Sequence, residues 1–244
     1  MIVLGWGTAA AMAVLVALAA FVSSAGHLGP GREMVVAAVR ALVQLAAVSV
    51  IIAAVVRSLP LTVAFVLVMF LVATVTSARR LTDERGGLLA GLSIAAGALP
   101  VLVVVLVSGA VPARGIAVVP VSGIVIGGAM SATSVAGRRA MDELHTRWGE
   151  YEAGISLGLS ERDAALEICR PSATQALTPA LDQTRTVGLV TLPGAFVGVL
   201  LGSGDPVQAG VAQLLVLVGL LAAEAVAVSV TVELVARRLI RRHG

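Results

Sequence analysis

Long apolar runs recur along most of this 244-residue chain, separated by short stretches that hold charges, glycine or proline. An α-helix rises about 1.5 Å per residue, so about 20 apolar residues cross a hydrocarbon layer about 30 Å thick. Such windows predict seven membrane-spanning helices, at residues 3–23, 34–56, 60–78, 88–108, 116–136, 186–203 and 207–235. The pattern therefore predicts an all-α, polytopic integral membrane protein, with residues 1–244 forming one transmembrane domain.

The positions of arginine predict the orientation of these spans. An odd number of spans places the two termini on opposite sides, and cytoplasmic loops carry an excess of basic residues. With the N-terminus outside and the C-terminus inside, only Arg57 and Arg114 lie outside. The arginines that then lie inside are Arg32, Arg79, Arg80, Arg85, those from Arg138 to Arg185, and Arg237, Arg238, Arg241 and Arg242. The chain is thus expected in the cell membrane as a multi-pass protein, N-out and C-in.

One segment, residues 137–185, is too long and too polar to be a short loop, since it holds 8 of the 14 acidic residues. An apolar stripe runs through its first part at helical spacing, formed by Met141, Leu144, Trp148, Tyr151 and Ile155. Two interpretations fit this stripe: a helix lying on the membrane surface, or a cytoplasmic extension of the fifth span that packs on a neighbour.

The sequence after the stripe predicts a helix, a tight turn and a second helix. Gly158 can adopt the left-handed conformation that ends a helix. Ser160 followed by Asp163 forms a capping pattern that begins another helix, and Pro171 is expected to end it. A short helix held across its predecessor in this way is suited to insertion into a groove on a partner protein.

Composition narrows the possible functions. The chain is 58% hydrophobic and 13% charged, against about 25% charged residues in soluble domains. All 17 basic side chains are arginine, and without lysine the chain cannot form a Walker A loop or bind ATP through one. Cys169, the single cysteine, has no neighbours of zinc-binding spacing and is expected to be a reduced thiol. No bound cofactor or resident metal is expected. No nucleic-acid partner is expected either, because the arginines lie in short loops between spans.

The cytoplasmic segment resembles the EAA motif, by which ABC importer permeases dock on their ATPase subunit. That motif reads EAA, three residues, Gly, nine residues, Ile, one residue and Leu-Pro. This chain has Glu152, Ala153 and Gly154, then Gly158, Ile168 and, after Arg170, Pro171. Gly154 and Arg170 depart from the motif, while the spacing and the turn residue are kept. The resemblance implies an ATPase-docking site that includes these residues and Ser160.

Longer stretches resemble the FetB-type family of iron-export ABC permeases over about residues 35–240. The stretches are RALVQL, PVSGIVIGGAMSATSVAGRRAMDEL and TVGLVTLPGAFVGVLLGSGDP. In that family the second stretch carries two asparagines where this chain has Gly128 and Ser131. The resemblance implies the membrane-spanning permease subunit of an ABC transporter, which exports a metal ion (iron) as a homodimer. ATP would then bind to, and be hydrolysed by, a separate ATPase subunit, so the chain itself would not be an enzyme.

Polar side chains within the spans are candidates for a transport pathway, because they are costly at membrane depth unless they face a cavity or a partner. Arg40 and Gln44 share a face of the second span, although Arg40 can also extend to the interface. Glu224 lies inside the last span and requires a proton, an arginine or a cation. It either converges with Arg40 and Gln44 on a polar site or forms a structural ion pair with Arg40.

Residues that interrupt a helix or have small side chains give further pathway candidates. Pro193 and Gly194 interrupt the sixth predicted span, which is typical of a helix that lines a transport site. Glycines at four-residue spacing equally fit a close helix crossing. In the fifth span, Ser131 fits the same two interpretations, a helix that lines a transport site or a close helix crossing. Met130 in the same span offers a sulfur atom, which by itself predicts no metal site.

A function of another class also fits the composition: a secondary transporter or small channel driven by an ion gradient. Inverted repeats are typical of that class, and the sequence shows no convincing internal repeat.

Overall fold

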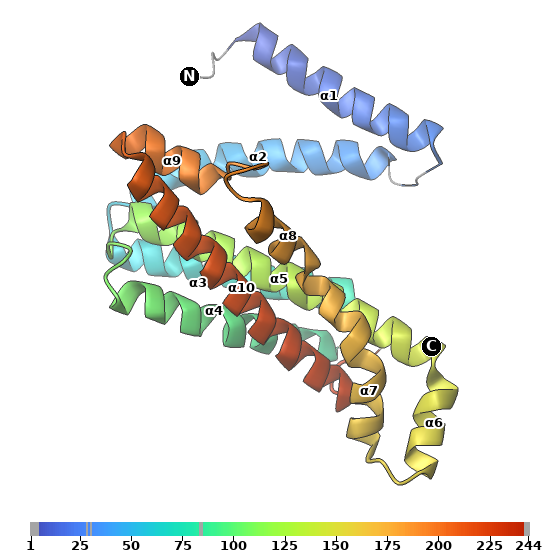
Figure 1. Cartoon of the computed structure of the whole chain (residues 1–244). Coiled ribbons are helices and arrows are strands. Elements are labelled where there is room, and N and C mark those ends of the chain that lie inside the picture. Colours follow the sequence, from blue (N-terminus) through green and yellow to red (C-terminus); the bar gives the residue numbers. More distant parts are fainter. Residues whose placement is uncertain (1–4, 28, 30, 83–84, 242–244) are drawn as a thin grey trace. The chain divides into compact units, whose positions relative to one another are not determined.

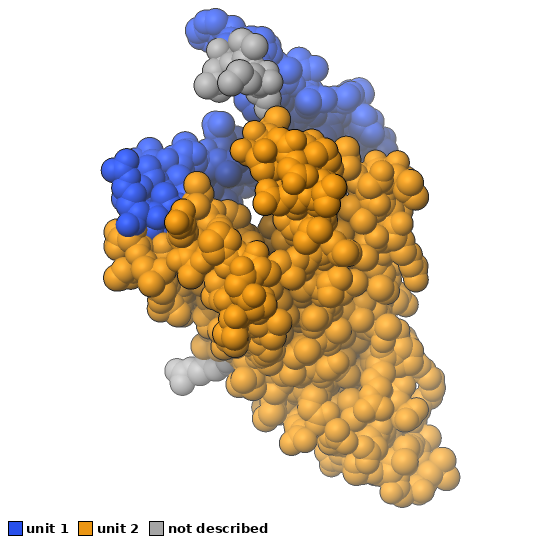
Figure 2. Space-filling view, turned by 60° about the vertical axis from the view of Figure 1, so that its left-hand side comes forward, with its two compact units in different colours: residues 1–57 blue, residues 58–244 orange. Residues whose placement is uncertain are grey.

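We describe the chain from a computed structural model, in which residues 5–27, 29, 31–82 and 85–241 are described. It divides into two compact units, residues 1–57 and 58–244, which are coloured separately in Figure 2. Each unit is treated by itself below.

The first unit is a pair of packed helices, α1 (Trp6–Ala25) and α2 (Gly31–Val55). Gly31 lies against α1, since a Cβ atom there would be 2.5 Å from the Ser24 Oγ and 2.9 Å from the Ala20 carbonyl oxygen. The missing side chain of Gly31 therefore permits the close turn between the two helices.

The second unit is built around four long helices that run side by side (Figure 1). These are α3 (Leu59–Leu81), α4 (Ala90–Val107), α5 (Gly115–Thr146) and α10 (Pro206–Ala236). A 3₁₀ turn, η1 (Arg85–Leu89), leads into α4. Among the described residues of the whole chain, six helices are long and apolar enough to cross a membrane, namely these four with α1 and α2. The all-helical, multi-pass architecture predicted from the sequence is confirmed.

Between α5 and α10 the chain forms shorter elements. A hairpin of α6 (Trp148–Ser156) and α7 (Glu161–Thr174) projects from one end of the four long helices (Figure 1). The chain then returns along α5 and α10 through η2 (Gln175–Leu177) and α8 (Thr178–Thr186) to α9 (Gly194–Ser203).

The predicted sixth span, residues 186–203, is wrong as a continuous helix. Residues 187–193 are not helical, and α9 has only 10 residues, enough for about 15 Å, or half of a hydrocarbon layer. Gly188 adopts a φ of +81°, and proline at position 193 disfavours a helical conformation at the residue before it. These two residues explain the break.

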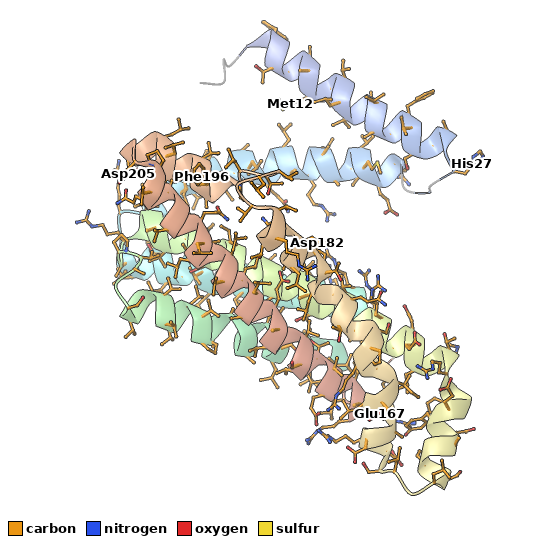
Figure 3. The ribbon with its side chains drawn as sticks, in the orientation of Figure 1. Met12, His27, Glu167, Asp182, Phe196 and Asp205 are labelled. Carbon is orange, nitrogen blue, oxygen red and sulfur yellow. The ribbon has the colours of Figure 1, made fainter. Side chains whose placement is uncertain are left out.

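Two details of the polar segment also differ from prediction. The stripe does not lie on one helix, because α5 ends at Thr146 and α6 begins after Arg147. Pro171 does not end its helix, which continues to Thr174. Proline there removes only the hydrogen bond to the carbonyl of Glu167, a residue on the exposed face of α7 where water can replace it (Figure 3).

Small residues allow α10 to approach α4 and α5 closely. A Cβ atom on Gly97 would lie 2.2 Å from the Ala223 carbonyl oxygen, and one on Gly137 would lie 2.5 Å from Leu81 and 3.2 Å from Thr231. Lipid is as apolar as leucine, so helices in a membrane associate through such close packing and not through the hydrophobic effect. The resulting core contains buried alanines along all of these helices.

Candidate functional site

The α6–α7 hairpin is closed by a glycine turn of the predicted kind. Gly158 has a φ of +97°, and its amide donates to the Ile155 carbonyl at 2.9 Å. The Leu159 amide donates to the Gly154 carbonyl at 3.1 Å. This pair of bonds defines a Schellman motif, which satisfies the last carbonyls of α6. The predicted turn at Gly158 is confirmed.

The start of α7 is capped as predicted. The Ser160 Oγ accepts a hydrogen bond from the Asp163 amide at 3.1 Å, and the same hydroxyl donates to the Asp163 carboxylate at 2.7 Å. Both helices of the hairpin therefore have satisfied ends at the turn, so the turn is held in one conformation.

Residues of the EAA-like motif divide between the surface and the interior. Ala153 and Glu152 are exposed on α6, and the Glu152 carboxylate accepts from the Trp148 indole N–H at 2.9 Å. Gly154 faces α7, since a Cβ atom there would lie 3.3 Å from that of Ala164. Ile168 is buried, so it holds α7 on the bundle instead of contacting a partner.

The tip of the hairpin is apolar and exposed. Leu157 is 87% exposed and Leu159 is 45% exposed, on either side of Gly158. Two exposed leucines therefore flank the turn at the end of the hairpin.

α7 packs firmly on the extension of α5. The Cys169 Sγ donates to the Ala140 carbonyl at 3.4 Å, and both residues are fully buried. Burial, together with the negative charge of Glu143, raises the pKa of the Cys169 thiol to about 11. Cys169 is thus a reduced, unreactive packing residue. The first part of the stripe lies on the extension of α5 beyond residue 136, where Met141 is buried against the core, and the second part lies on α6.

An ion cluster joins α7 to the end of α10. The Arg162 guanidinium donates to both carboxylate oxygens of Glu233, at 2.6 and 2.8 Å, and Arg237 donates to the same carboxylate at 2.6 Å. The hydrogen bond to Glu233 raises the pKa of Arg162. Glu233 and Arg237 are four residues apart, so their pairing agrees with helical spacing. The bidentate partner of Glu233, Arg162, is 71 residues away in the chain and could not be found from spacing.

A second contact joins α6 to the residues after α10. The Arg238 guanidinium lies 5.1 Å from the Trp148 ring centre and 5.3 Å from that of Tyr151, and it donates to the Tyr151 hydroxyl at 3.1 Å. Arg238 has a φ of +57°, which turns the chain back toward the hairpin. Both helices of the hairpin are therefore tied to the end of α10.

Glu224, in α10, is buried against α5. A Cβ atom on Gly128 would lie 2.9 Å from the Glu224 Oε1, so glycine at position 128 leaves the space that the carboxyl group occupies. Within the described residues of the second unit, Glu224 has no hydrogen bond or ion pair. Its predicted convergence with Arg40 and Gln44 stays a prediction, because those two residues belong to α2 of the first unit.

The other pathway candidates have different surroundings. Met130 packs on the apolar core around Ala129, and Ser131 is exposed on α5. Among residues 5–27, 29, 31–82 and 85–241, no group of three histidine, cysteine or acidic side chains could hold a metal ion. Pro193 and Gly194, in contrast, line a cavity.

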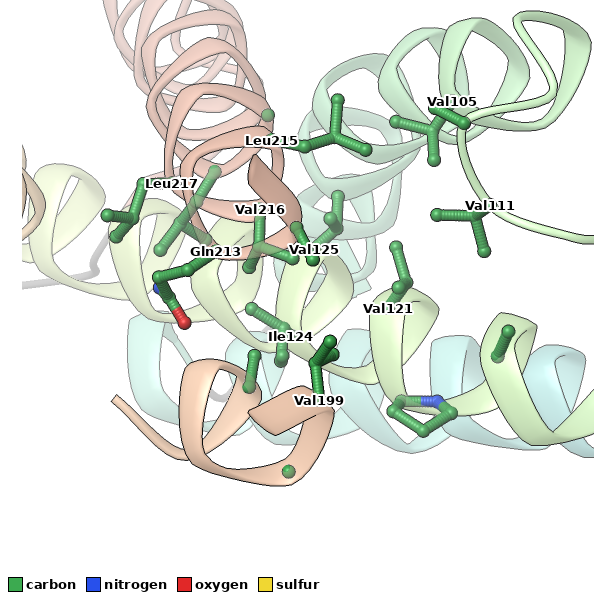
Figure 4. A pocket seen from close by; sticks show the side chains of 18 of the residues that line it. Val105, Val111, Val121, Ile124, Val125, Val199, Gln213, Leu215, Val216 and Leu217 are labelled. Carbon is green, nitrogen blue, oxygen red and sulfur yellow. The ribbon is translucent and has the colours of Figure 1, made fainter. Parts of the chain in front are cut away.

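This cavity of about 930 Å³ lies between α4, α5, α9 and α10 and is shown in Figure 4. Apolar side chains such as Val121, Ile124 and Val216 form most of its wall. Gln213 reaches it from α10 and accepts a hydrogen bond from the Phe196 amide at 3.1 Å. Pro193 and Gly194 thus lie at the start of a half-length helix beside a cavity, and their part in a transport site stays a prediction.

Comparison with known proteins places the chain among membrane proteins. Residues 6–240 match the uncharacterised protein family UPF0014. The "UPF0014 membrane protein STAR2" of rice is 30% identical over 219 residues, which cover 88% of this chain and 77% of the relative. YjkA of Bacillus subtilis is 28% identical over 209 residues, covering 83% and 82%.

A third relative, the "Probable iron export permease protein FetB" of Escherichia coli, is 31% identical over 125 residues, covering 51% of this chain and 48% of the relative. No solved structure matches the chain. The match over residues 6–240 and the identity to STAR2 lead to one conclusion: the chain belongs to the UPF0014 family of multi-pass membrane proteins.

Proposed function

We propose that the chain is the permease subunit of an ABC transporter, and that it exports a metal ion, iron by its likeness to FetB. In this proposal residues 1–244 act as one permease domain, and ATP binds to a separate ATPase subunit. The α6–α7 hairpin is the observation that carries the proposal. It combines the spacing of the docking motif with a left-handed turn at Gly158 and exposed leucines on both sides of that turn.

The contacts of the hairpin provide a route from ATP to the membrane. When two ATPase subunits close around ATP, each pulls the hairpin docked on it. The bidentate pair of Arg162 with Glu233 and the contact of Arg238 with Tyr151 then transfer that displacement to α10. α10 carries Glu224 and also forms a wall of the cavity. Paired ATPase subunits offer two docking grooves, so we propose a homodimer of this chain.

We further propose that the chain crosses the membrane seven times, N-out and C-in. The additional crossing, sixth in chain order, is the broken segment of residues 187–193 and α9, which connects the end of α8 to the start of α10. The proposal rests on the arginine distribution and on the direction in which these elements run.

Cysteine labelling tests the orientation. Asp205→Cys, at the turn between α9 and α10, should react with a membrane-impermeant maleimide on intact cells, whereas Gly149→Cys, exposed on α6, should react only after permeabilisation. Native Cys169 should give little background, because it is buried and its thiol pKa is raised. External labelling at position 149 would exclude both the orientation and the docking site.

The docking turn is tested by Gly158→Leu. A bulky side chain resists a φ of +97°, at a cost of about 1–2 kcal/mol or more, so the turn should open and the ATPase should no longer co-purify from native membranes. Gly149→Leu is the matched control, because Gly149 lies on the same hairpin, has open space around it and has no left-handed φ. Co-purification of the ATPase with both variants would remove Gly158 from the docking site.

The link between hairpin and α10 is tested by Glu233→Gln. The amide cannot hold Arg162 and Arg237 as a carboxylate does, while the hairpin turn is unaffected. We expect the ATPase to remain bound and its substrate-stimulated hydrolysis to fall in reconstituted vesicles. Glu167→Gln, on the exposed face of α7, should behave as wild type. Unchanged stimulation in Glu233→Gln would show that the displacement takes another path.

The role of Glu224 is tested by Glu224→Gln, Arg40→Gln and the double variant. If Glu224 faces a pathway, Glu224→Gln should keep the melting temperature and lower stimulated hydrolysis, since a buried amide costs less than a buried charge. If Glu224 instead pairs with Arg40, each single change should destabilise the protein by about 3–5 kcal/mol and the double change should restore it. Wild-type behaviour of all three would remove both residues from the pathway.

A further inference from the structure

The cavity between α4, α5, α9 and α10 carries unused hydrogen-bond donors at one place on its wall. The amides of Gly194 and Ala195 precede the first intrahelical bond of α9, which is made by Val197 to the Pro193 carbonyl. The N-cap residue, Pro193, provides no side-chain cap. Both residues line the cavity, and Gly194 has open space on its side-chain face.

Gln213, a side chain of α10, lies at the same part of the cavity wall. It is only 4% exposed, and its amide oxygen is occupied by Phe196, the third residue of α9. Its amide nitrogen has two further donors and no hydrogen bond among the described residues. The Gln213 side chain and the two backbone amides line the same cavity, so a hydrogen-bond acceptor bound there could accept from all three.

The rest of the wall sets the character of the ligand. The described lining residues include aliphatic side chains, alanine, glycine, proline and three glutamines, and none that is charged. A bare cation would find no counter-charge here, and a multiply charged anion would find no arginine. The volume of about 930 Å³ lies within the roughly 300–1,000 Å³ that is usual for sites of drug-sized molecules.

The depth of the donors limits the head group. Gln213 lies two turns inside α10, about 10 Å from its start at Pro206. The phosphate groups of bilayer lipids stay in the interfacial layer, whereas a carboxyl or carbonyl group at the end of one chain is small enough to reach this depth.

We propose that this cavity binds a single-chain amphipathic molecule. Its carboxyl or carbonyl oxygen accepts hydrogen bonds from Gly194, Ala195 and Gln213, and its hydrocarbon part lies against the apolar wall. The ligand is distinct from the exported ion and binds the permease itself, whether or not an ATPase is docked. A ligand bound in this cavity contacts α9, α5 and α10 together.

The experiment uses the purified full chain in lipid nanodiscs and a palmitic acid that carries a diazirine near its methyl end. Illumination and peptide mass spectrometry should locate the cross-links on α5, α9 and α10 at the cavity wall. Gly198→Phe should lower their yield about tenfold, because Gly198 lines the cavity and has room for a side chain. Gly202→Phe is the matched control on the same helix, with equally open surroundings away from the wall.

Two further arms test the head group and the source of the ligand. A diazirine-bearing hexadecane should label less than the acid, and Gln213→Leu should abolish that difference while leaving hydrocarbon labelling in place. Equal labelling by a diazirine-bearing phosphatidylcholine would show a bilayer lipid and overturn the proposal, as would cross-links that Gly198→Phe leaves unchanged. Gly198→Leu places a smaller side chain in the cavity and is used if Gly198→Phe does not fold.

The result of the labelling experiment can be distinguished from a failure of the proposed transporter function. Gly158→Leu should bind the acid as wild type does, since its hairpin lies at the other end of α10. Loss of ATPase docking with intact labelling would therefore leave the cavity site standing, and the reverse result would overturn the cavity site alone.

Discussion

Close packing of α10 against α4 and α5 is the constraint on which the rest of the second unit depends. The Ala223 carbonyl could not approach α4 if Gly97 had a side chain, and Glu224 could not lie against α5 if Gly128 had one. In lipid these contacts have no hydrophobic driving force behind them, so van der Waals packing, with interhelical hydrogen bonds such as that between Ser77 and Ser134, holds the helices together. The side chain of Glu224 is therefore buried in the space that glycine leaves at position 128.

The same helix collects the polar contacts of the hairpin at its other end. Arg162 and Arg237 share the carboxylate of Glu233, and Arg238 covers the rings of Trp148 and Tyr151. Exposed ion pairs of this kind add little to stability, commonly about 0–1 kcal/mol each. Their value is geometric: a bidentate guanidinium fixes orientation as well as distance. A hairpin held at two points cannot tilt without moving α10, which makes the contact suited to transmitting motion.

Sequence periodicity predicted the elements that depend on local physics. Six apolar helices follow from runs of suitable length, and the turn at Gly158 with its Ser160 cap follows from the conformations that these residue types favour. Periodicity did not predict the features that depend on the surroundings of a residue in the folded protein. The helix continues through Pro171 because the lost hydrogen bond faces solvent, and residues 187–193 are not helical although they read as an apolar span. The pairing of Arg162 with Glu233 and the cavity beside Gln213 require tertiary structure.

The break in the helix before Gly194 explains why the cavity lies where it does. A continuous helix from residue 186 to 203 would satisfy its own amides and fill the space beside α5 and α10 with side chains. Because the helix begins only at Gly194, the amides of its first residues precede its first intrahelical hydrogen bond, and Gly194 and Ala195 line the cavity. Gln213 satisfies one of those amides, and two remain. Any molecule that fills the cavity and accepts from them completes the hydrogen bonding that the chain leaves open, so binding and the integrity of the crossing are physically linked.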